Sequence, residues 1–151
     1  MGHTHYFCFR TEKGKAKELE LTYQRAVKDC QRIIKRYYAI NGGLSGYTAH
    51  TTIGQYGGLC VNGKGSEGCE EFSLPEHFSQ AVNMGFQFCK TNRRPYDLVV
   101  SACLAVLKHR LGDNIDVSSD GHFNDGINFA REVTRLALKK QVVVERLGDA
   151  V

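Results

Sequence analysis

Three segments of the chain carry the hydrophobic pattern of helices. In residues 17–39 the apolar side chains recur at steps of three and four, which predicts an amphipathic helix with a basic outer face. Residues 95–111 begin with a proline and are then apolar on nearly every side, which predicts a central, buried helix. A third helical pattern covers residues 124–140 and ends in two lysines, where the helix dipole favours cations.

Strand patterns separate these helices. Residues 3–9 alternate, so that one face of the predicted strand carries His3, His5, Phe7 and Phe9. Further strands are expected at residues 59–61, 69–74, 85–89 and 115–117, with one short strand around Thr51. The order of these elements predicts an α+β fold. Its mostly antiparallel sheet would have four to six strands, with about three helices packed on one side.

The composition is that of one ordinary globular domain, residues 1–151. Hydrophobic residues make up 42% of the chain and charged residues 24%, and no apolar run approaches the ~20 residues of a membrane span. The six cysteines include no Cys-x-x-Cys pair, which indicates reduced thiols rather than a zinc ribbon. We therefore expect a cytoplasmic protein with no secretory signal and no membrane partner. The composition leaves open whether the chain forms a homo-oligomer.

Glycine is concentrated in residues 42–68, which hold nine of the 16 glycines and only two formally charged residues. We expect a glycine-rich loop region here that would serve as a lid over a binding site. Within it, Gly63, Gly65 and Gly68 have the spacing of the dinucleotide-binding fingerprint. That fingerprint must open a helix, whereas β-like residues and a proline follow Gly68. The context therefore favours a hairpin turn.

The segment from Cys89 to Pro95 joins a predicted strand to a predicted helix. It holds three cations, Lys90, Arg93 and Arg94, and no acid. Because a helix N-terminus attracts anions, we expect this turn to bind a phosphate or a carboxylate, with Lys90 at the rim of the main pocket. The alternative is a solvated basic turn.

Two histidines on one strand face are the second candidate feature. His3 and His5 have a geometry that metals use, but the spacing identifies no third ligand. A third ligand would come close only through folding, from His50, His122, Asp97 or Asp120. We therefore expect these histidines to contact a ligand, and we expect no bound metal and no cofactor.

Two further turns offer side-chain oxygens. Asp97 lies in the first turn of the buried helix, where the helix dipole favours a carboxylate. Ser118, Ser119 and Asp120 lie at a strand-to-helix turn. Each of these side chains is either a helix cap or a contact to a sugar or phosphate group.

Four segments together resemble a group of small uncharacterised proteins of tailed phages. The segments are residues 3–6, residues 62–63 with 69–72, residues 88–91 with 95–97, and residues 118–121. The resemblance implies a viral protein in the cytoplasm of a bacterial host, and it implies that the four segments belong to one site. Small phage proteins include inhibitors of host defence and sponges that trap its nucleotide signals. The phage context suggests a role of this kind by analogy.

The leading hypothesis is therefore a binding protein for a small anionic, nucleotide-derived ligand. Its contacts would be His3, His5, Asn62, Lys90, Thr91, Arg93, Arg94, Tyr96, Asp97, Ser118, Ser119 and Asp120. The alternative is a small hydrolase or phosphoryl-chemistry enzyme that uses histidine, aspartate and lysine side chains, with its catalytic residues unassigned. A module that binds RNA or protein through the basic face of residues 12–36 is less favoured, because acidic residues interrupt that face.

Overall fold

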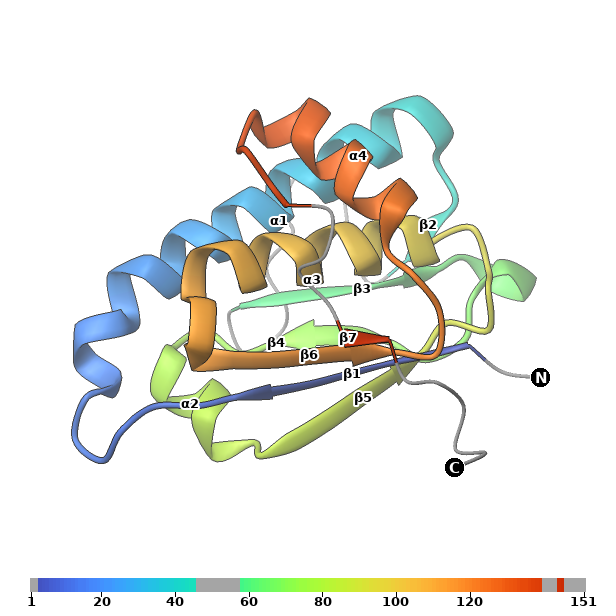
Figure 1. Cartoon of the computed structure of the whole chain (residues 1–151). Helices are drawn as coiled ribbons and strands as arrows, with labels where there is room; N and C mark the ends of the chain where they lie inside the picture. The colour runs from blue at the N-terminus through green and yellow to red at the C-terminus, as the bar shows by residue number, and fades with distance from the viewer. Residues whose placement is uncertain (1–2, 46–57, 140–143, 146–151) are drawn as a thin grey trace.

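The computed structural model describes residues 3–45, 58–139 and 144–145, and it confirms the α+β fold. The strands divide into two sheets rather than one (Figure 1). The main sheet has the order β5-β1-β6-β7 and consists of β5 (Phe86–Lys90), β1 (Thr4–Phe9), β6 (Ile115–Ser119) and β7 (Val144–Glu145). The smaller antiparallel sheet consists of β2 (Leu44–Ser45), β3 (Leu59–Gly63) and β4 (Phe72–Leu74).

The topology of the main sheet brings three chain segments to one end. The central strand β1 is antiparallel to both β5 and β6, so those two strands run parallel to each other. In the register, His5 lies opposite Cys89 on one side and opposite Ser119 on the other. The carboxyl ends of β5 and β6 therefore flank the start of β1, where Figure 1 marks the N-terminus.

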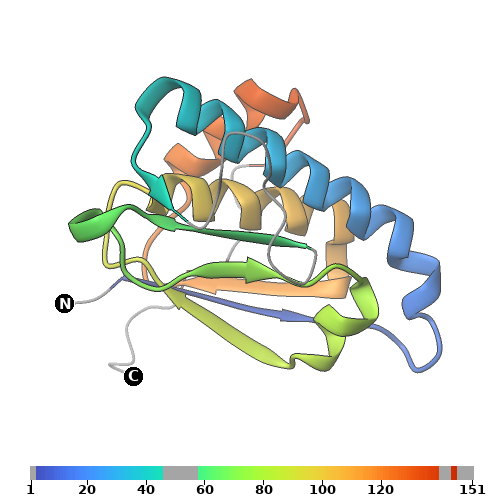
Figure 2. The same ribbon diagram turned by 180° about the vertical axis from the view of Figure 1, so that it is seen from behind.

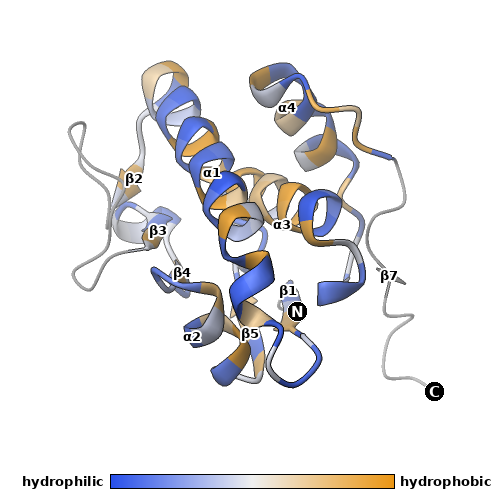
Figure 3. Ribbon diagram, turned by 90° about the vertical axis from the view of Figure 1, so that its left-hand side faces the viewer, coloured by the Kyte–Doolittle hydropathy of each residue, from blue (hydrophilic) through white to orange (hydrophobic). Residues whose placement is uncertain are grey.

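Three long helices cover one side of the main sheet (Figures 1 and 2). They are α1 (Glu20–Asn41), α3 (Asp97–Leu111) and α4 (Asn124–Thr134), and a short helix α2 (Phe78–Asn83) precedes β5. The central helix α3 is apolar around most of its circumference, whereas α1 is apolar on one side only, as Figure 3 shows. Because α3 follows β5 and α4 follows β6, both helices begin at the same end of the sheet.

The predicted α4 is shorter in the structure than its sequence pattern. It ends at Thr134 instead of residue 140, because Arg135 adopts a left-handed backbone conformation with φ of 61°. The N–H of Arg135 donates to the carbonyl of Arg131 and closes the last turn. The predicted strand around Thr51 and residues 46–57 of the proposed lid lie outside the described residues.

The alternation of β1 separates a buried inner face from an outer face, as predicted. Phe7 and Phe9 are buried. The ring of Phe7 meets that of Phe72 in β4 edge to face, with the two ring centroids 5.6 Å apart. On the outer face, Phe86 and Phe88 of β5 are exposed. His3 and His5 continue the inner row, so they point toward the helices. Within the described ranges no helix is both long and apolar enough to cross a membrane.

Candidate functional site

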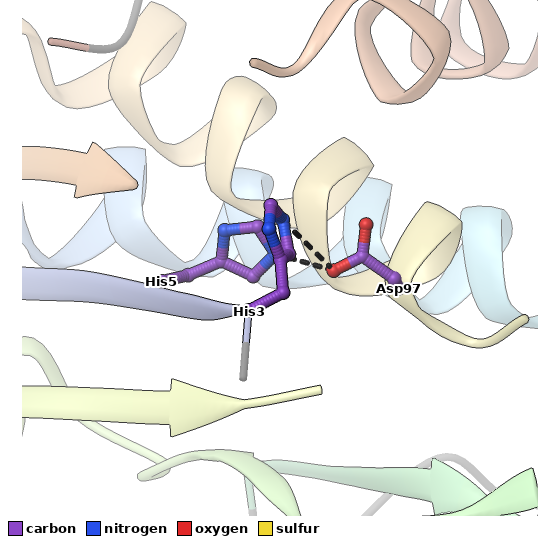
Figure 4. Close-up of side chains that lie close together, drawn as sticks. All are labelled: His3, His5 and Asp97. Atoms are coloured by element: carbon purple, nitrogen blue, oxygen red, sulfur yellow. Dashed lines mark hydrogen bonds and ion pairs between the residues drawn. The ribbon is translucent and has the colours of Figure 1, made fainter. Parts of the chain in front are cut away.

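Two histidines from the start of β1 meet one carboxylate from the start of α3. Nε2 of His5 lies 2.6 Å from Oδ1 of Asp97, and Nε2 of His3 lies 3.7 Å from the same oxygen. Figure 4 shows both imidazole rings directed at this carboxylate. The two rings stand edge to face, with their centroids 4.8 Å apart. We call these three residues the His–His–Asp cluster.

His5 is fully buried and is held from both sides. Its Nδ1 lies 2.9 Å from Oγ of Ser119, its neighbour in the register of β6. The N–H of Gly121 donates to the same hydroxyl oxygen at 3.1 Å, which fixes the Ser119 side chain. The ring of Phe123 packs against His5 at 4.8 Å. These contacts leave His5 one orientation, with Nε2 toward Asp97.

Asp97 is the member of the cluster that reaches the surface, with 26% of its side chain exposed. The hydroxyl of Thr91, the residue that follows β5, donates to Oδ1, the oxygen that also faces His5 and His3. Burial raises the pKa of this carboxyl, but the hydrogen bonds of His5 and Thr91 and the charge of His5 bring it below its ordinary value. Asp97 is therefore an ionised carboxylate at neutral pH.

His3 is only 5% exposed, and its Nδ1 has no hydrogen-bond partner among the described residues. Its ring lies so close to the backbone of Gly121 that a Cβ at that position would overlap Cε1 of His3. Burial, followed by the nearby His5 and Arg93, lowers the pKa of His3 despite the opposing effect of Asp97. The ring is thus neutral near pH 7, and one buried nitrogen is left without a partner.

A cavity of about 540 Å³ opens beside the cluster, between the N-terminal ends of α3 and α4. We call it the α3–α4 cavity. His3 and Asp97 form part of its wall, with Arg93, Arg94, His122 and Asp125 around them. Gly126 of α4 packs so closely on Ser101 of α3 that no Cβ would fit, which brings the two helices together behind the cavity.

The basic turn between β5 and α3 has a defined backbone conformation. Asn92 and Arg93 both have positive φ angles, 53° and 58°, and the N–H groups of Thr91 and Asn92 both donate to the carbonyl of His3. This turn places Arg93 and Arg94 at the cavity, where the sequence predicted an anion site. The N–H groups of residues 97–99 in the first turn of α3 are not free to bind an anion, because they donate to the carbonyls of residues 94–96.

Lys90 does not line the α3–α4 cavity, which corrects its predicted place at the rim. It is exposed at the end of β5, opposite Thr4 in the register. Opposite residues of an antiparallel pair point to the same face, so Lys90 points to the outer face and His5 to the inner face. Its backbone instead holds the strand end, since its N–H donates to Oε1 of Glu70 at 2.6 Å.

Ser118 and Asp120 also lie away from the cavity. Ser118 stands opposite Tyr6 on the outer face. Asp120 accepts hydrogen bonds from the Tyr6 hydroxyl at 3.1 Å and from the N–H of Thr4 at 3.2 Å. These contacts stabilise the end of the sheet. Only some of the residues in the four segments that carry the phage resemblance therefore lie at the cavity.

Asn62 and Tyr96 have local structural roles. The Asn62 side chain bridges its own hairpin, with its amide donating to the carbonyl of Cys69 and its oxygen accepting from the N–H of Cys69. Since β3 and β4 are antiparallel, the glycines between them belong to a hairpin, as the sequence predicted. Tyr96 is buried, and its hydroxyl donates to the carbonyl of Glu70 at 2.6 Å.

The structure brings together His3, His5, Thr91, Arg93, Arg94, Asp97 and Ser119 of the predicted contacts, and it adds His122 and Asp125. The sequence offers His122 only as a candidate third metal ligand, and no pattern in it identifies Asp125. Both stand just after the turn at residues 118–121, and their approach to Arg93 depends on the packing of α4 against α3.

Ser119, His5 and Asp97 are connected in a row, but the row is not arranged as a serine hydrolase triad. Ser119 is fully buried behind His5, and the carboxylate is the end of the row that reaches the cavity. A triad needs its hydroxyl at the substrate and its carboxylate inside. The row therefore holds Asp97 in place at the cavity wall.

No protein-family model matches the chain, and no curated protein or solved structure is significantly similar to it. The chemistry of the α3–α4 cavity and of the His–His–Asp cluster is therefore the basis on which a function can be inferred. That chemistry combines two arginines, two carboxylates and two histidines around one opening.

Proposed function

We propose that the protein binds a small phosphate-bearing ligand of nucleotide type in the α3–α4 cavity. The observation that carries the proposal is the placement of Arg93 and Arg94 beside the buried His3, in a cavity where two helices begin. Two guanidinium groups thus act on one opening, whereas the N–H groups of residues 97–99 are already hydrogen-bonded and do not add to them.

The arginines suit a phosphate group in both charge and availability. Among the described residues neither Arg93 nor Arg94 forms an ion pair, whereas Arg110 is committed to Asp29 at 2.5 Å. A guanidinium group offers planar, paired donors that match two oxygens of a phosphate. The cavity volume of about 540 Å³ falls in the usual range for small-molecule sites.

The carboxylates in the same wall narrow the ligand class further. Asp97 and Asp125 would repel a ligand that was anionic throughout, but they accept hydrogen bonds from hydroxyl and amino groups. A nucleotide carries a phosphate at one end and a sugar and base with such donors at the other. In the phage context that the resemblance implies, the protein would sequester a nucleotide signal of host defence.

The first test is a thermal-unfolding panel with the full chain in the presence of EDTA. The panel contains inorganic phosphate, nucleoside mono- and diphosphates, and cyclic mono- and dinucleotides. A ligand present at a hundred times its Kd adds about 2.7 kcal/mol of stability, which corresponds to a rise in Tm of roughly 5–10 °C for a chain of this size.

Charge-removing variants locate the binding. In Arg93→Gln and Arg94→Gln we expect the Kd for the stabilising nucleotide to rise by about tenfold or more, since a hydrogen bond to a charged group contributes about 1.5–3 kcal/mol. Arg25→Gln removes an exposed arginine of α1 that does not line the cavity, and it should bind normally. No stabilisation by any nucleotide at millimolar concentration would contradict the proposal.

An enzyme is the second candidate, because the ionised Asp97 is held rigidly at the wall of an anion cavity. In that case a hydrolytic or phosphoryl-transfer reaction would change the ligand, whereas a binding protein returns it intact. The discriminating experiment incubates stoichiometric protein with the stabilising nucleotide, denatures the protein by heat and identifies the released ligand by mass spectrometry. An unchanged ligand excludes the enzyme, and a product favours it.

A further inference from the structure

We infer that His3, His5 and Asp97 form a binding site for one divalent transition-metal ion such as zinc. The inference is independent of the proposed anion site, and it departs from our sequence-based expectation of no metal. That expectation rested on the lack of a third ligand for the two histidines. The fold supplies this ligand by placing the first residue of α3 opposite the start of β1.

The distances within the cluster are close to those of a coordination sphere. The potential ligand atoms all lie within 4.8 Å of one another. Two ligands at about 2.0–2.1 Å from one ion are roughly 3.0–3.4 Å apart. The separations between Oδ1 of Asp97 and the Nε2 atoms are 2.6 Å for His5 and 3.7 Å for His3, on either side of this value. The outer limit of 4.8 Å exceeds this value, so coordination of one ion would draw the ligand atoms closer together.

The groups behind the ligands are those that orient metal-bound residues. A metal-bound imidazole usually donates its second N–H to an oxygen atom, and Oγ of Ser119 lies 2.9 Å from Nδ1 of His5 in that position. The Thr91 hydroxyl orients the carboxylate of Asp97 in the same way. Coordination through Nε2 requires that nitrogen to carry no proton, so the neutral His5 ring would hold its one proton on Nδ1 and donate it to Oγ of Ser119.

His3 is held in a fixed position at the cluster. Its exposed fraction is only 5%, its ring packs against Gly121, and its Nε2 is the nitrogen that faces Asp97. The nitrogen without a partner among the described residues is Nδ1, which an ion bound to Nε2 would not contact. His3 is therefore inferred to be a ligand from the position of Nε2, the burial of the ring and its place in the cavity wall.

The donor set defines the class of metal. Two imidazole nitrogens and one carboxylate oxygen suit zinc, cobalt, manganese or iron(II), whereas magnesium and calcium prefer oxygen ligands alone. Three protein ligands leave at least one coordination position open, as in sites where a metal also binds water or substrate. Asp97 and His3 both line the α3–α4 cavity, so the open position would face it.

The test is a titration of the untagged full chain, first stripped with EDTA and then dialysed, with Zn²⁺ by calorimetry and with Co²⁺ by absorption spectroscopy. No nucleotide is present, so the result does not depend on the anion site. We expect one ion per chain with a Kd in the micromolar range or tighter. The Co²⁺ spectrum should show visible d–d bands without a thiolate-to-cobalt charge-transfer band. Mg²⁺ should not compete.

Variants then assign the ligands. His3→Ala and Asp97→Asn should each weaken Zn²⁺ binding by more than tenfold, and Ser119→Ala should weaken it by about 10–100-fold through loss of orientation. His109→Ala is the matched control, because His109 is an exposed histidine in the last turn of α3 that does not line the cavity, and its loss should leave the Kd unchanged. Circular dichroism and thermal unfolding establish whether each variant is folded. If only one of His3→Ala and Asp97→Asn folds, that variant alone tests the site.

Three results would overturn the site. They are the absence of Zn²⁺ binding at millimolar concentration, a charge-transfer band that reveals cysteine ligands, and unchanged affinity in the folded ligand variants. The nucleotide panel in EDTA tests the proposed anion site separately. A failure of the metal site can therefore be distinguished from a failure of the anion site.

Discussion

His5 and Asp97 lie 92 positions apart in the chain, and Nε2 of one is 2.6 Å from Oδ1 of the other. This contact joins the start of the central strand to the start of the buried helix. The same carboxylate oxygen also accepts from Thr91, so one atom ties β1, the basic turn and α3 together. The position of the arginines at the cavity depends on this junction.

Replacement of Asp97 by alanine should therefore lower the free energy of unfolding by about 1–3 kcal/mol, because it leaves the buried Thr91 hydroxyl and the His5 ring without their acceptor. Asp97→Asn keeps one acceptor oxygen and should lose less. Urea denaturation in EDTA measures both. The matched control is Asp125→Ala, which removes an exposed acid from the first turn of α4 and should change stability by no more than about 0.5 kcal/mol. Equal losses in Asp97→Ala and Asp125→Ala would contradict the junction.

Gly121→Ala should destabilise the protein by about 1–3 kcal/mol, because its Cβ would overlap the His3 ring. The sharper expectation is rescue. In the double variant His3→Ala with Gly121→Ala, the overlap is gone, so the second substitution should be nearly neutral. A double-mutant cycle by thermal or urea unfolding measures this coupling, and strict additivity of the two substitutions would show that the ring does not occupy this position.

The cysteines should differ strongly in reactivity in the folded chain. Burial raises the pKa of Cys89 to about 12 and that of Cys60 to about 11, which keeps both as thiols at neutral pH. Cys69 is exposed and should react first with iodoacetamide. Mass spectrometry after short labelling should find the label at Cys69 well before Cys30, Cys89 and Cys103, and labelling of Cys103 at the same rate would contradict the buried core.

Glu20 should make stability depend on pH in the acidic range. Burial alone would raise the pKa of Glu20, but the N–H of Phe78 and the side chains of His77 and Gln24 bring it below the ordinary 4.5. A lowered pKa in the folded state means that the stabilisation is present above pH 4.5 and is lost as the pH falls through the folded-state pKa.

The check is Glu20→Gln, which removes the charge and keeps the side-chain length. Above pH 4.5 the variant should be less stable than the wild type by up to about 1 kcal/mol. Below the folded-state pKa the difference should shrink toward zero. A difference that stays constant across this range would show that the carboxylate charge does not hold the start of α2.

Local patterns in the sequence predicted which side chains of β1 lie on its buried face, but not which residues of other elements contact them. Alternation placed His3 and His5 on the buried face because the period of a strand requires it. The partners of His5 depend on register: Ser119 lies opposite it only because β6 pairs with β1 at that offset. Nothing local to residues 3–9 encodes that offset. The third member of the cluster likewise depended on where α3 docks.

The error at Lys90 was avoidable from the same alternation. Cys89 is buried in β5, so its neighbour must point to the other face of the sheet. The prediction for Lys90 instead treated all three cations of the turn as one group that faces the pocket. Asn62 was assigned to the ligand for its polarity, whereas its amide satisfies backbone groups of its own hairpin. Polar residues at turns frequently serve the turn itself.

A two-dimensional ¹H–¹⁵N spectrum of the full chain, recorded during titration, tests whether ligands bind in the α3–α4 cavity. The probes are inorganic pyrophosphate and the nucleotide that stabilises the chain most. We expect the largest amide shifts to cluster in residues 93–98 and 121–126, and we expect Arg94→Gln to reduce them. Shifts confined to the outer face around residues 86–90 or to the hairpin of β3 and β4, or no shifts with either probe, would contradict binding in this cavity.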